Sequence, residues 1–169
     1  MIMDREVRSV ASSLTKKTIE EGLSEFGHSS LRNEQKDIIN AVMNDRDVVV
    51  VMHTGGGKSL CYQLPAFCQS GYAVVVCPLL SLMEDQTKAL KAIGVQAEML
   101  NSTQSYVLEQ VPILKRLENS TPHGGIKLLY VTPEKLTSSE QLMKVLQNSS
   151  DAGLISRFVI DEAHCVNEW

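Results

Sequence analysis

A glycine-rich turn places the strongest constraint on how this chain can fold. It follows the apolar, β-branched run of residues 48–52 and consists of Thr54, Gly55, Gly56, Gly57, Lys58 and Ser59. Such a run predicts a buried parallel strand, and open α/β sheets bind ligands at the carboxyl ends of these strands. Consecutive glycines let backbone N–H groups curve around an anion, the lysine adds positive charge, and the serine supplies a hydroxyl for Mg²⁺. We therefore expect a phosphate-binding loop, although Met52 replaces the usual first glycine and a plain strand-to-helix connection is the alternative.

A second polar loop follows the apolar run of residues 158–160. There Asp161 and Glu162 stand where a strand delivers carboxylates to a bound metal. We expect Asp161 to hold Mg²⁺ and Glu162 to orient and deprotonate the water that attacks the γ-phosphate. A solvated helix start is the alternative for this loop alone. The two loops together predict a nucleoside triphosphatase site.

Strand patterns alternate with helix patterns along the chain. The patterns predict helices at 4–25, 31–43, 80–93 and 103–118, a helix from Lys58 to about Cys68 that meets Pro65, and strands at 48–52, 73–77, 95–100, 126–131 and 155–160. Pro133 fits the first position of a further helix. This alternation predicts an α/β fold with a mainly parallel, doubly wound sheet.

Composition limits the classes of function. A chain of 169 residues and 18.7 kDa, 43% of it hydrophobic, can build one core but not two sizeable domains. Its four cysteines have no C-x-x-C spacing, which indicates reduced thiols, and no apolar run is long enough to cross a bilayer. We expect a soluble, intracellular protein. The net charge of −4 predicts that nucleic acid, if bound, contacts a local track only.

Four blocks in order give the chain a specific resemblance. Residues 54–66 (TGGGKSLCYQLPA), 77–86 (CPLLSLMEDQ), 130–136 (YVTPEKL) and 161–165 (DEAHC), followed by Trp169, resemble the RecQ family of superfamily 2 DNA helicases. The resemblance implies a RecA-like ATP-binding domain at residues 28–169, incomplete at its carboxyl end, after an N-terminal helical segment at residues 1–27. A DEAD-box RNA helicase is disfavoured by the segment 61–65 and by His164.

The family also implies roles for individual residues. ATP and Mg²⁺ would bind at the glycine loop and at Asp161, and the catalytic group would be Lys58, Asp161, Glu162 and His164. Residues 26–35 resemble an adenine-recognition motif, in which Gln35 reads the base edge, Arg32 stacks on it, and His28 replaces the usual aromatic ring. His53 replaces the usual proline before the turn, which would make the loop less rigid.

Single-stranded DNA, or the tail of a tailed duplex, is the implied nucleic-acid partner. The residues that the resemblance assigns to it are Ser81, Gln86, Thr132, Lys135 and Trp169. Thr132 can cap a helix whose free N–H groups would suit a phosphate. His164 would link the nucleotide and DNA sites. For a eukaryotic source, the resemblance implies a nuclear location and roles in DNA repair and recombination.

Two hypotheses of different kinds remain. The first is an enzyme, the ATP- and DNA-binding part of a 3′-to-5′ DNA helicase. The second is a truncated or split homologue that holds nucleotide or DNA without turnover, because the family's arginine finger lies on a second RecA-like domain absent from these residues. In the family fold, a strand that follows the Asp-Glu segment lies between the two loop-bearing strands. We therefore expect an incomplete, association-prone domain.

Overall fold

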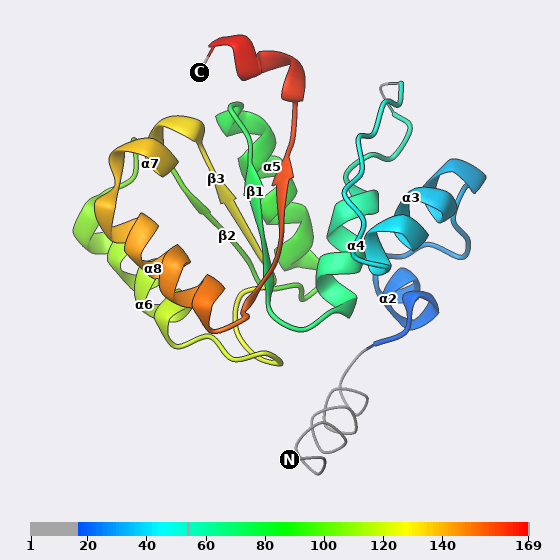
Figure 1. Cartoon of the computed structure of the whole chain (residues 1–169), viewed down its shortest axis with the longest axis horizontal. Coiled ribbons are helices and arrows are strands. Elements are labelled where there is room, and N and C mark those ends of the chain that lie inside the picture. Colours follow the sequence, from blue (N-terminus) through cyan, green and yellow to red (C-terminus); the bar gives the residue numbers. More distant parts are fainter. Residues whose placement is uncertain (1–16, 54, 169) are drawn as a thin grey trace. The chain divides into compact units, whose positions relative to one another are not determined.

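The computed structural model describes residues 17–53 and 55–168, in two compact units divided between Ser70 and Gly71 (Figure 1). Thr54, Trp169 and residues 1–16 lie outside the described residues, and so do the predictions made for them. In the described part of the chain, no helix combines the length and apolarity that a membrane span requires.

The first unit consists of three helices and the loops between them. They are α2 (Ile19–Glu25), α3 (Asn33–Met43) and α4 (Leu60–Cys68). Thr18 begins α2 with a capping box, since its hydroxyl accepts from the Glu21 N–H and the Glu21 carboxylate accepts from the Thr18 N–H. The helix predicted at residues 4–25 therefore begins only at Ile19 in its described part. Leu23, Ile39 and Leu64 pack together in the core of this unit.

The strand predicted at residues 48–52 is wrong. These residues form no strand, and the side chains of Val49 and Val51 are 95% and 92% exposed. A strand needs a hydrogen-bonded neighbour, and no described segment pairs with this run. Its β-branched residues favour extended backbone but cannot supply that partner. The helix after Lys58 is confirmed, and α4 includes Pro65 and ends at Cys68.

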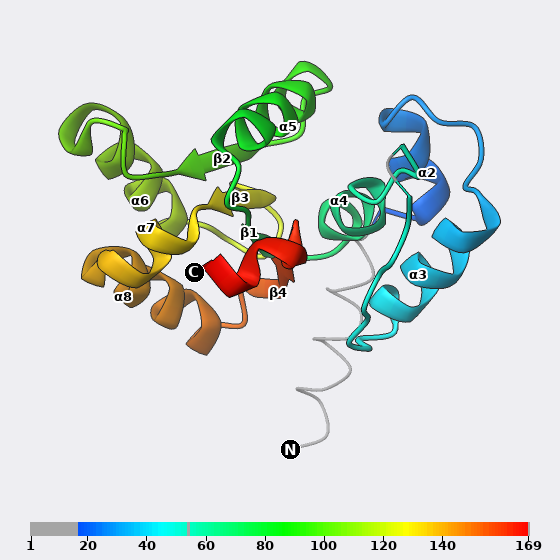
Figure 2. The same cartoon turned by 90° about the horizontal axis from the view of Figure 1, so that it is seen from above.

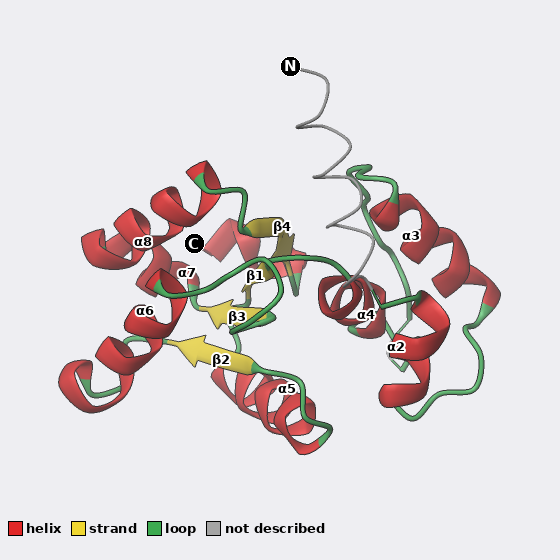
Figure 3. Ribbon diagram, turned by 90° about the horizontal axis from the view of Figure 1, so that it is seen from below, coloured by secondary structure: helices red, strands yellow, loops and turns green. Residues whose placement is uncertain are grey.

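The second unit is a four-stranded sheet with helices on both faces (Figure 3). The strands are all parallel, in the order β2-β3-β1-β4. In chain order the elements are β1 (Tyr72–Val76), α5 (Leu80–Ala92), β2 (Ala97–Leu100), the π-helix η1 (Tyr106–Gln110), α6 (Val111–Glu118), β3 (Leu128–Val131), α7 (Pro133–Ser138), α8 (Glu140–Asp151), β4 (Ile155–Ile160) and the 3₁₀-helix η2 (Ala163–Glu168). The predicted parallel α/β fold is confirmed, and the predicted strands and helices of this unit are present with small shifts at their ends.

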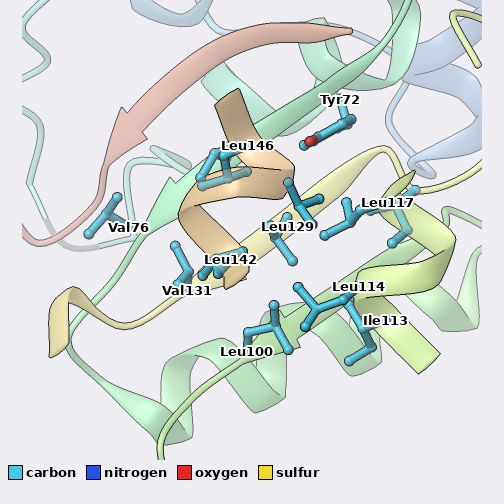
Figure 4. Close-up of a cluster of buried hydrophobic side chains, with 13 residues drawn as sticks. Tyr72, Val76, Leu100, Ile113, Leu114, Leu117, Leu129, Val131, Leu142 and Leu146 are labelled. Carbon is cyan, nitrogen blue, oxygen red and sulfur yellow. The ribbon is translucent and has the colours of Figure 1, made fainter. Parts of the chain in front are cut away.

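The main core of this unit lies between the sheet and α6 and α8 (Figure 4). Leu114, Leu129 and Leu142 are almost completely buried there, and they come from α6, β3 and α8. Helix α5 lies on the opposite face, where Met83 and Leu90 are buried. Since both faces are covered, β1 and β3 are continuous apolar runs, as expected for parallel strands.

The carboxyl ends of the four parallel strands lie along one edge of the sheet (Figure 2). The residues that follow these strands directly are Cys77, Asn101, Thr132 and Asp161. This edge is where α/β sheets bind ligands. The fold of the second unit therefore brings two predicted site residues, Thr132 and Asp161, to the carboxyl end of the sheet.

Candidate functional site

The glycine loop of the first unit is held by side chains from the start of α3. Gln35 is buried, with 5% exposure, and its Nε2 donates to the carbonyls of Gly57 at 3.3 Å and Gly56 at 3.5 Å. The guanidinium of Arg32 donates to the carbonyl of Gly55 at 3.1 Å. The structure thus joins two residues of the predicted adenine motif to the loop predicted to bind phosphate.

Gln35 also fixes the start of its own helix. Its Oε1 accepts from the Arg32 N–H at 2.9 Å, which satisfies an N–H at the helix terminus while Nε2 reaches the loop. His28 is exposed before this helix, and its backbone N–H donates to Leu23. Of the predicted adenine motif, Gln35 and Arg32 are the residues whose side chains the structure hydrogen-bonds to the loop.

The loop itself has the backbone that glycine allows. Gly55 and Gly57 have φ of +80° and +82°, in the left-handed region that other residues enter at a cost. The Gly56 N–H donates to the His53 carbonyl at 3.0 Å, and a Cβ on Gly56 would meet that carbonyl oxygen at 3.0 Å. This glycine cradle is a tight turn that larger residues would strain or crowd, and glycine-rich turns let backbone approach an anion closely.

Lys58 and Ser59 follow the cradle at the start of α4. The Lys58 ammonium donates to the Met52 carbonyl at 3.1 Å and the His53 carbonyl at 3.5 Å, so the lysine folds back over its own loop. Ser59 is the N-cap of α4, and its side chain makes no capping hydrogen bond. An ammonium and a hydroxyl beside a glycine cradle are the groups that bind a triphosphate with its metal.

In the second unit, the acidic loop continues from β4. The Asp161 N–H donates to the Val76 carbonyl at 2.9 Å, which extends the β1–β4 ladder and holds Asp161 at the edge of the sheet. Asp161 Oδ1 accepts from the Glu162 N–H at 3.0 Å. Glu162 has a φ of +54°, which is uncommon for a residue with a side chain and is found mainly at sites that need it.

Two neighbours complete this acidic loop. His164 Nδ1 lies 3.2 Å from Glu162 Oε2, so these two residues are in direct contact. Cys77, which follows the adjacent strand β1, is buried. Burial raises the pKa of the Cys77 thiol, and the carboxylates of Asp161 and Glu162 raise that pKa further. No role was predicted for Cys77 from the sequence. Its position directly after a predicted strand was the one feature that could have placed it near the acidic loop.

The predicted nucleic-acid residues of this unit lie on α5 and at α7. Ser81 is exposed in the first turn of α5, and Gln86 is half-buried one and a half turns further on. The Thr132 hydroxyl accepts from the Lys135 N–H at 3.3 Å, which confirms the predicted cap of α7. Thr132 is itself buried, and the Lys135 ammonium donates to Gln110 Oε1. Gln110 was missed by sequence analysis, since a single glutamine inside an amphipathic pattern carries no signal.

Together, a glycine-lysine-serine loop and an Asp-Glu-Ala-His segment after a parallel strand define the class of this protein as a phosphate-loop α/β protein. The chain belongs to the DEAD/DEAH box helicase family, because the model of that family matches residues 32–169. The resemblance to RecQ helicases is confirmed by curated relatives that carry RecQ-type names.

Three of these relatives show the extent of the similarity. The chain is 49% identical over 144 residues to ATP-dependent DNA helicase Q-like 2 of Arabidopsis thaliana, 44% identical over 144 residues to ATP-dependent DNA helicase Q1 of Rattus norvegicus, and 42% identical over 146 residues to ATP-dependent DNA helicase RecQ of Haemophilus influenzae. The alignments cover 85%, 85% and 86% of this chain but 20%, 23% and 22% of the relatives. The chain therefore spans about a fifth of their length.

A solved structure shows the same fold. The DUF1998 helicase MrfA, crystallised with DNA and AMPPNP, superimposes with a TM-score of 0.67 at 23% sequence identity. The match covers 86% of this chain and 20% of MrfA. This similarity supports the fold assignment alone.

Proposed function

We propose that this chain is the nucleotide-binding part of an ATP-dependent DNA helicase of the RecQ type, with 3′-to-5′ polarity. The observation that carries the proposal is the contact of Gln35 with the carbonyls of Gly56 and Gly57. It joins a side chain able to read adenine to a loop able to hold phosphate, within one small unit. Adenine nucleotides, ATP among them, offer both groups.

Each site residue then has a chemical role. Lys58 would leave the Met52 and His53 carbonyls for the β- and γ-phosphates, and Ser59 and Asp161 would hold Mg²⁺. Bound Mg²⁺ would neutralise charge on the phosphate oxygens. Glu162 would orient the attacking water and accept its proton, while His164 holds the Glu162 carboxylate in place. The glycine cradle and the carboxylate at the sheet edge fit these groups.

Single-stranded DNA, alone or as the tail of a duplex, is the proposed nucleic-acid partner. Ser81 is exposed at the start of α5, and Lys135 supplies a positive charge at α7. Thr132 would act by fixing the first turn of α7, since its hydroxyl is used by the Lys135 N–H. Trp169 and Gln86 would extend the contact. DNA-stimulated turnover would also need a second RecA-like domain as a partner.

The proposed setting follows from the same assignment. A RecQ-type helicase would work inside the cell, in the nucleus of a eukaryote, in DNA repair and recombination. A second candidate function is a module that binds nucleotide or DNA without turnover. The observation that favours it is that Lys58 is occupied by its own loop carbonyls and Glu162 by His164.

Nucleotide binding can be tested by thermal unfolding. ADP or ATP with Mg²⁺ at about a hundred times its dissociation constant should stabilise the fold by roughly 2.7 kcal/mol. For a domain of this size, that corresponds to a rise in melting temperature of about 5–10 °C. Lys58→Ala should remove the rise, whereas Lys36→Ala, at an exposed position of α3, should keep it. An equal rise in the Lys58→Ala variant would refute the assigned site.

A further inference from the structure

The π-helix η1 exposes three consecutive large apolar side chains. Tyr106 is 50% exposed, and Val107 and Leu108 are 71% and 77% exposed. Single π-helical turns are rare in proteins and frequently occur at functional sites. Contiguous exposed apolar side chains mark surfaces that bind something. None of these three residues has a role in the nucleotide site.

A buried polar network holds η1 in place. Gln110, the last residue of η1, is buried and donates through Nε2 to the Gln104 carbonyl at 2.8 Å and to the Asn101 carbonyl at 3.4 Å. Its Oε1 accepts from the Lys135 ammonium, which comes from α7. The network thus fixes η1 against the loop after β2 and against α7, at the edge where the strands end.

Tyr106 is fixed at a second point. Its hydroxyl donates to Oε1 of Gln141, in the first turn of α8, while half of its surface stays open to solvent. A tethered aromatic ring has already lost its rotational freedom. A ligand that stacks on it therefore loses no binding free energy to the ordering of this side chain. The ring is therefore prepared to receive a flat partner.

Lys135 gives this surface a cation that can neutralise a phosphate. Lys135 provides a cation that is joined through Gln110 to the same turn as Tyr106. The carboxylate of Glu109, also in η1, accepts from the Ser105 N–H at 2.7 Å and is engaged locally. A cation and an exposed aromatic ring on linked elements are the combination with which proteins neutralise the phosphates of single strands and stack their bases.

We infer that Tyr106 stacks on a base of single-stranded DNA next to the phosphate neutralised by Lys135. This inference rests on the proposed function and extends it, because it adds a base-contacting residue on η1 to the proposed backbone contacts of α5 and α7. The ring face accepts any base, so the contact adds affinity without sequence preference.

The test is a titration of the chain with a fluorescein-labelled oligothymidylate at several salt concentrations. Tyr106→Ala should weaken binding roughly 5- to 150-fold, since stacking of one base contributes about 1–3 kcal/mol. Tyr106→Phe, which keeps the ring, should recover most of that loss. Met143→Ala, at an exposed apolar position of α8, serves as the control and should bind like the unchanged chain.

Salt dependence separates stacking from charge neutralisation. Tyr106→Ala should leave the slope of log affinity against log salt unchanged, whereas Lys135→Ala should make it shallower by about 0.7. Photo-crosslinking of the unchanged chain to an oligonucleotide with 5-bromodeoxyuridine should mark the peptide that contains Tyr106. This second measurement does not depend on the folding of any variant.

The outcomes distinguish the inference from the function on which it rests. If the unchanged chain fails to bind the oligonucleotide, both the DNA assignment and this inference are wrong. If the chain binds but Tyr106→Ala binds equally well, or crosslinks avoid Tyr106, only the stacking inference is wrong. If Tyr106→Ala leaves DNA binding unchanged but alters the oligomeric state, the η1 surface is a protein contact. That outcome would also overturn the stacking inference.

Discussion

At the scale of single residues, Gly57 combines a left-handed backbone with a close contact to the Gln35 side chain. Gly55 and Gly57 share the same left-handed backbone, with φ near +80° at both positions. They differ in surroundings, since a Cβ on Gly55 would meet nothing within 4 Å and a Cβ on Gly57 would collide with Nε2 of Gln35. The pair therefore separates backbone strain from the contact with Gln35.

We predict that Gly55→Ala lowers the free energy of unfolding by about 1 kcal/mol, from backbone strain alone. Gly57→Ala should cost about 1–2 kcal/mol more, because the amide of Gln35 must leave the loop carbonyls. Urea unfolding measures both changes. With Gln35→Ala as the background, the two glycine substitutions should cost the same, and a persistent difference would show that Gln35 does not hold Gly57.

A second residue-scale prediction concerns alkaline pH. The pKa of Cys77 is raised above its ordinary value of 9.0, mainly by burial. A hydrogen bond to the Leu79 carbonyl opposes the rise, and the charges of Asp161, Glu162 and Cys165 add to it. The unfolded chain ionises this thiol at lower pH than the folded chain does. The stabilisation is therefore complete below pH 9.0 and is lost as the pH rises toward the folded pKa.

The measurement is the fall in melting temperature between about pH 8 and pH 10. Replacing Cys77 by alanine should make this fall smaller, because the thiol no longer ionises on unfolding. Val75→Ala, at a buried position of the preceding strand β1 that carries no ionisable group, is the control and should leave the fall unchanged. The comparison uses each variant's own melting temperature at about pH 8, so the small cavity left by Cys77→Ala does not enter. Equal falls in all three proteins would contradict the prediction.

At the scale of elements, strand β4 forms one edge of the described sheet. It pairs with β1 on one side, and its apolar Phe158 and Ile160 are 57% and 48% exposed. Exposed strand edges with apolar side chains pair readily with other chains. Of the two strands that were expected to lack a neighbour, β4 lies at one side of the described sheet, whereas residues 48–52 form no strand.

We predict that Phe158→Lys reduces concentration-dependent association, since a charge on an edge strand opposes pairing with another strand. Sedimentation velocity over a range of concentrations measures the change. Met143→Lys is the matched control, because Met143 is 48% exposed on α8 and lies on no sheet edge. If the unchanged chain stays monomeric, or if both variants act alike, the edge is not the cause of association.

The elements that sequence predicted well are those with local signals. Pro133 and the Thr132 cap begin α7, and Gly94, with φ of +80°, follows α5, since turn and cap chemistry depends on a few adjacent residues. Residues 48–52 carry a strong strand pattern but form no strand, because pairing depends on a partner elsewhere. The Gln110–Lys135 contact was not predictable for the same reason, since it joins residues far apart in the chain.

The candidate site also divides into parts that local motifs predict and parts that depend on contacts between distant residues. The glycine loop and the Asp161–Glu162 pair were predicted from short motifs whose chemistry is carried by adjacent residues. The hydrogen bonds of Gln35 to the loop carbonyls and the left-handed backbone of Glu162 became known only from the structure. Each depends on packing that a motif does not encode.

At the scale of the whole molecule, the chain consists of two compact units, and each carries one of the two motifs predicted from the sequence. The first holds the glycine loop with Lys58, and the second holds Asp161 and Glu162 at the edge of a parallel sheet. We propose that ATP binds at the glycine loop of the first unit. Turnover would further need an arginine from a second RecA-like domain, which contributes roughly 10³–10⁵ in rate in phosphoryl-transfer enzymes.

The most direct test of this account is ATP turnover with and without single-stranded DNA, together with displacement of a labelled strand from a tailed duplex. Residues 1–169 should show background turnover and no displacement. The same residues extended through a second RecA-like domain should show turnover that DNA stimulates and that Glu162→Gln abolishes. The account would be contradicted if the extended protein hydrolysed ATP equally well with Glu162→Gln, or if residues 1–169 unwound DNA faster than a Lys58→Ala control.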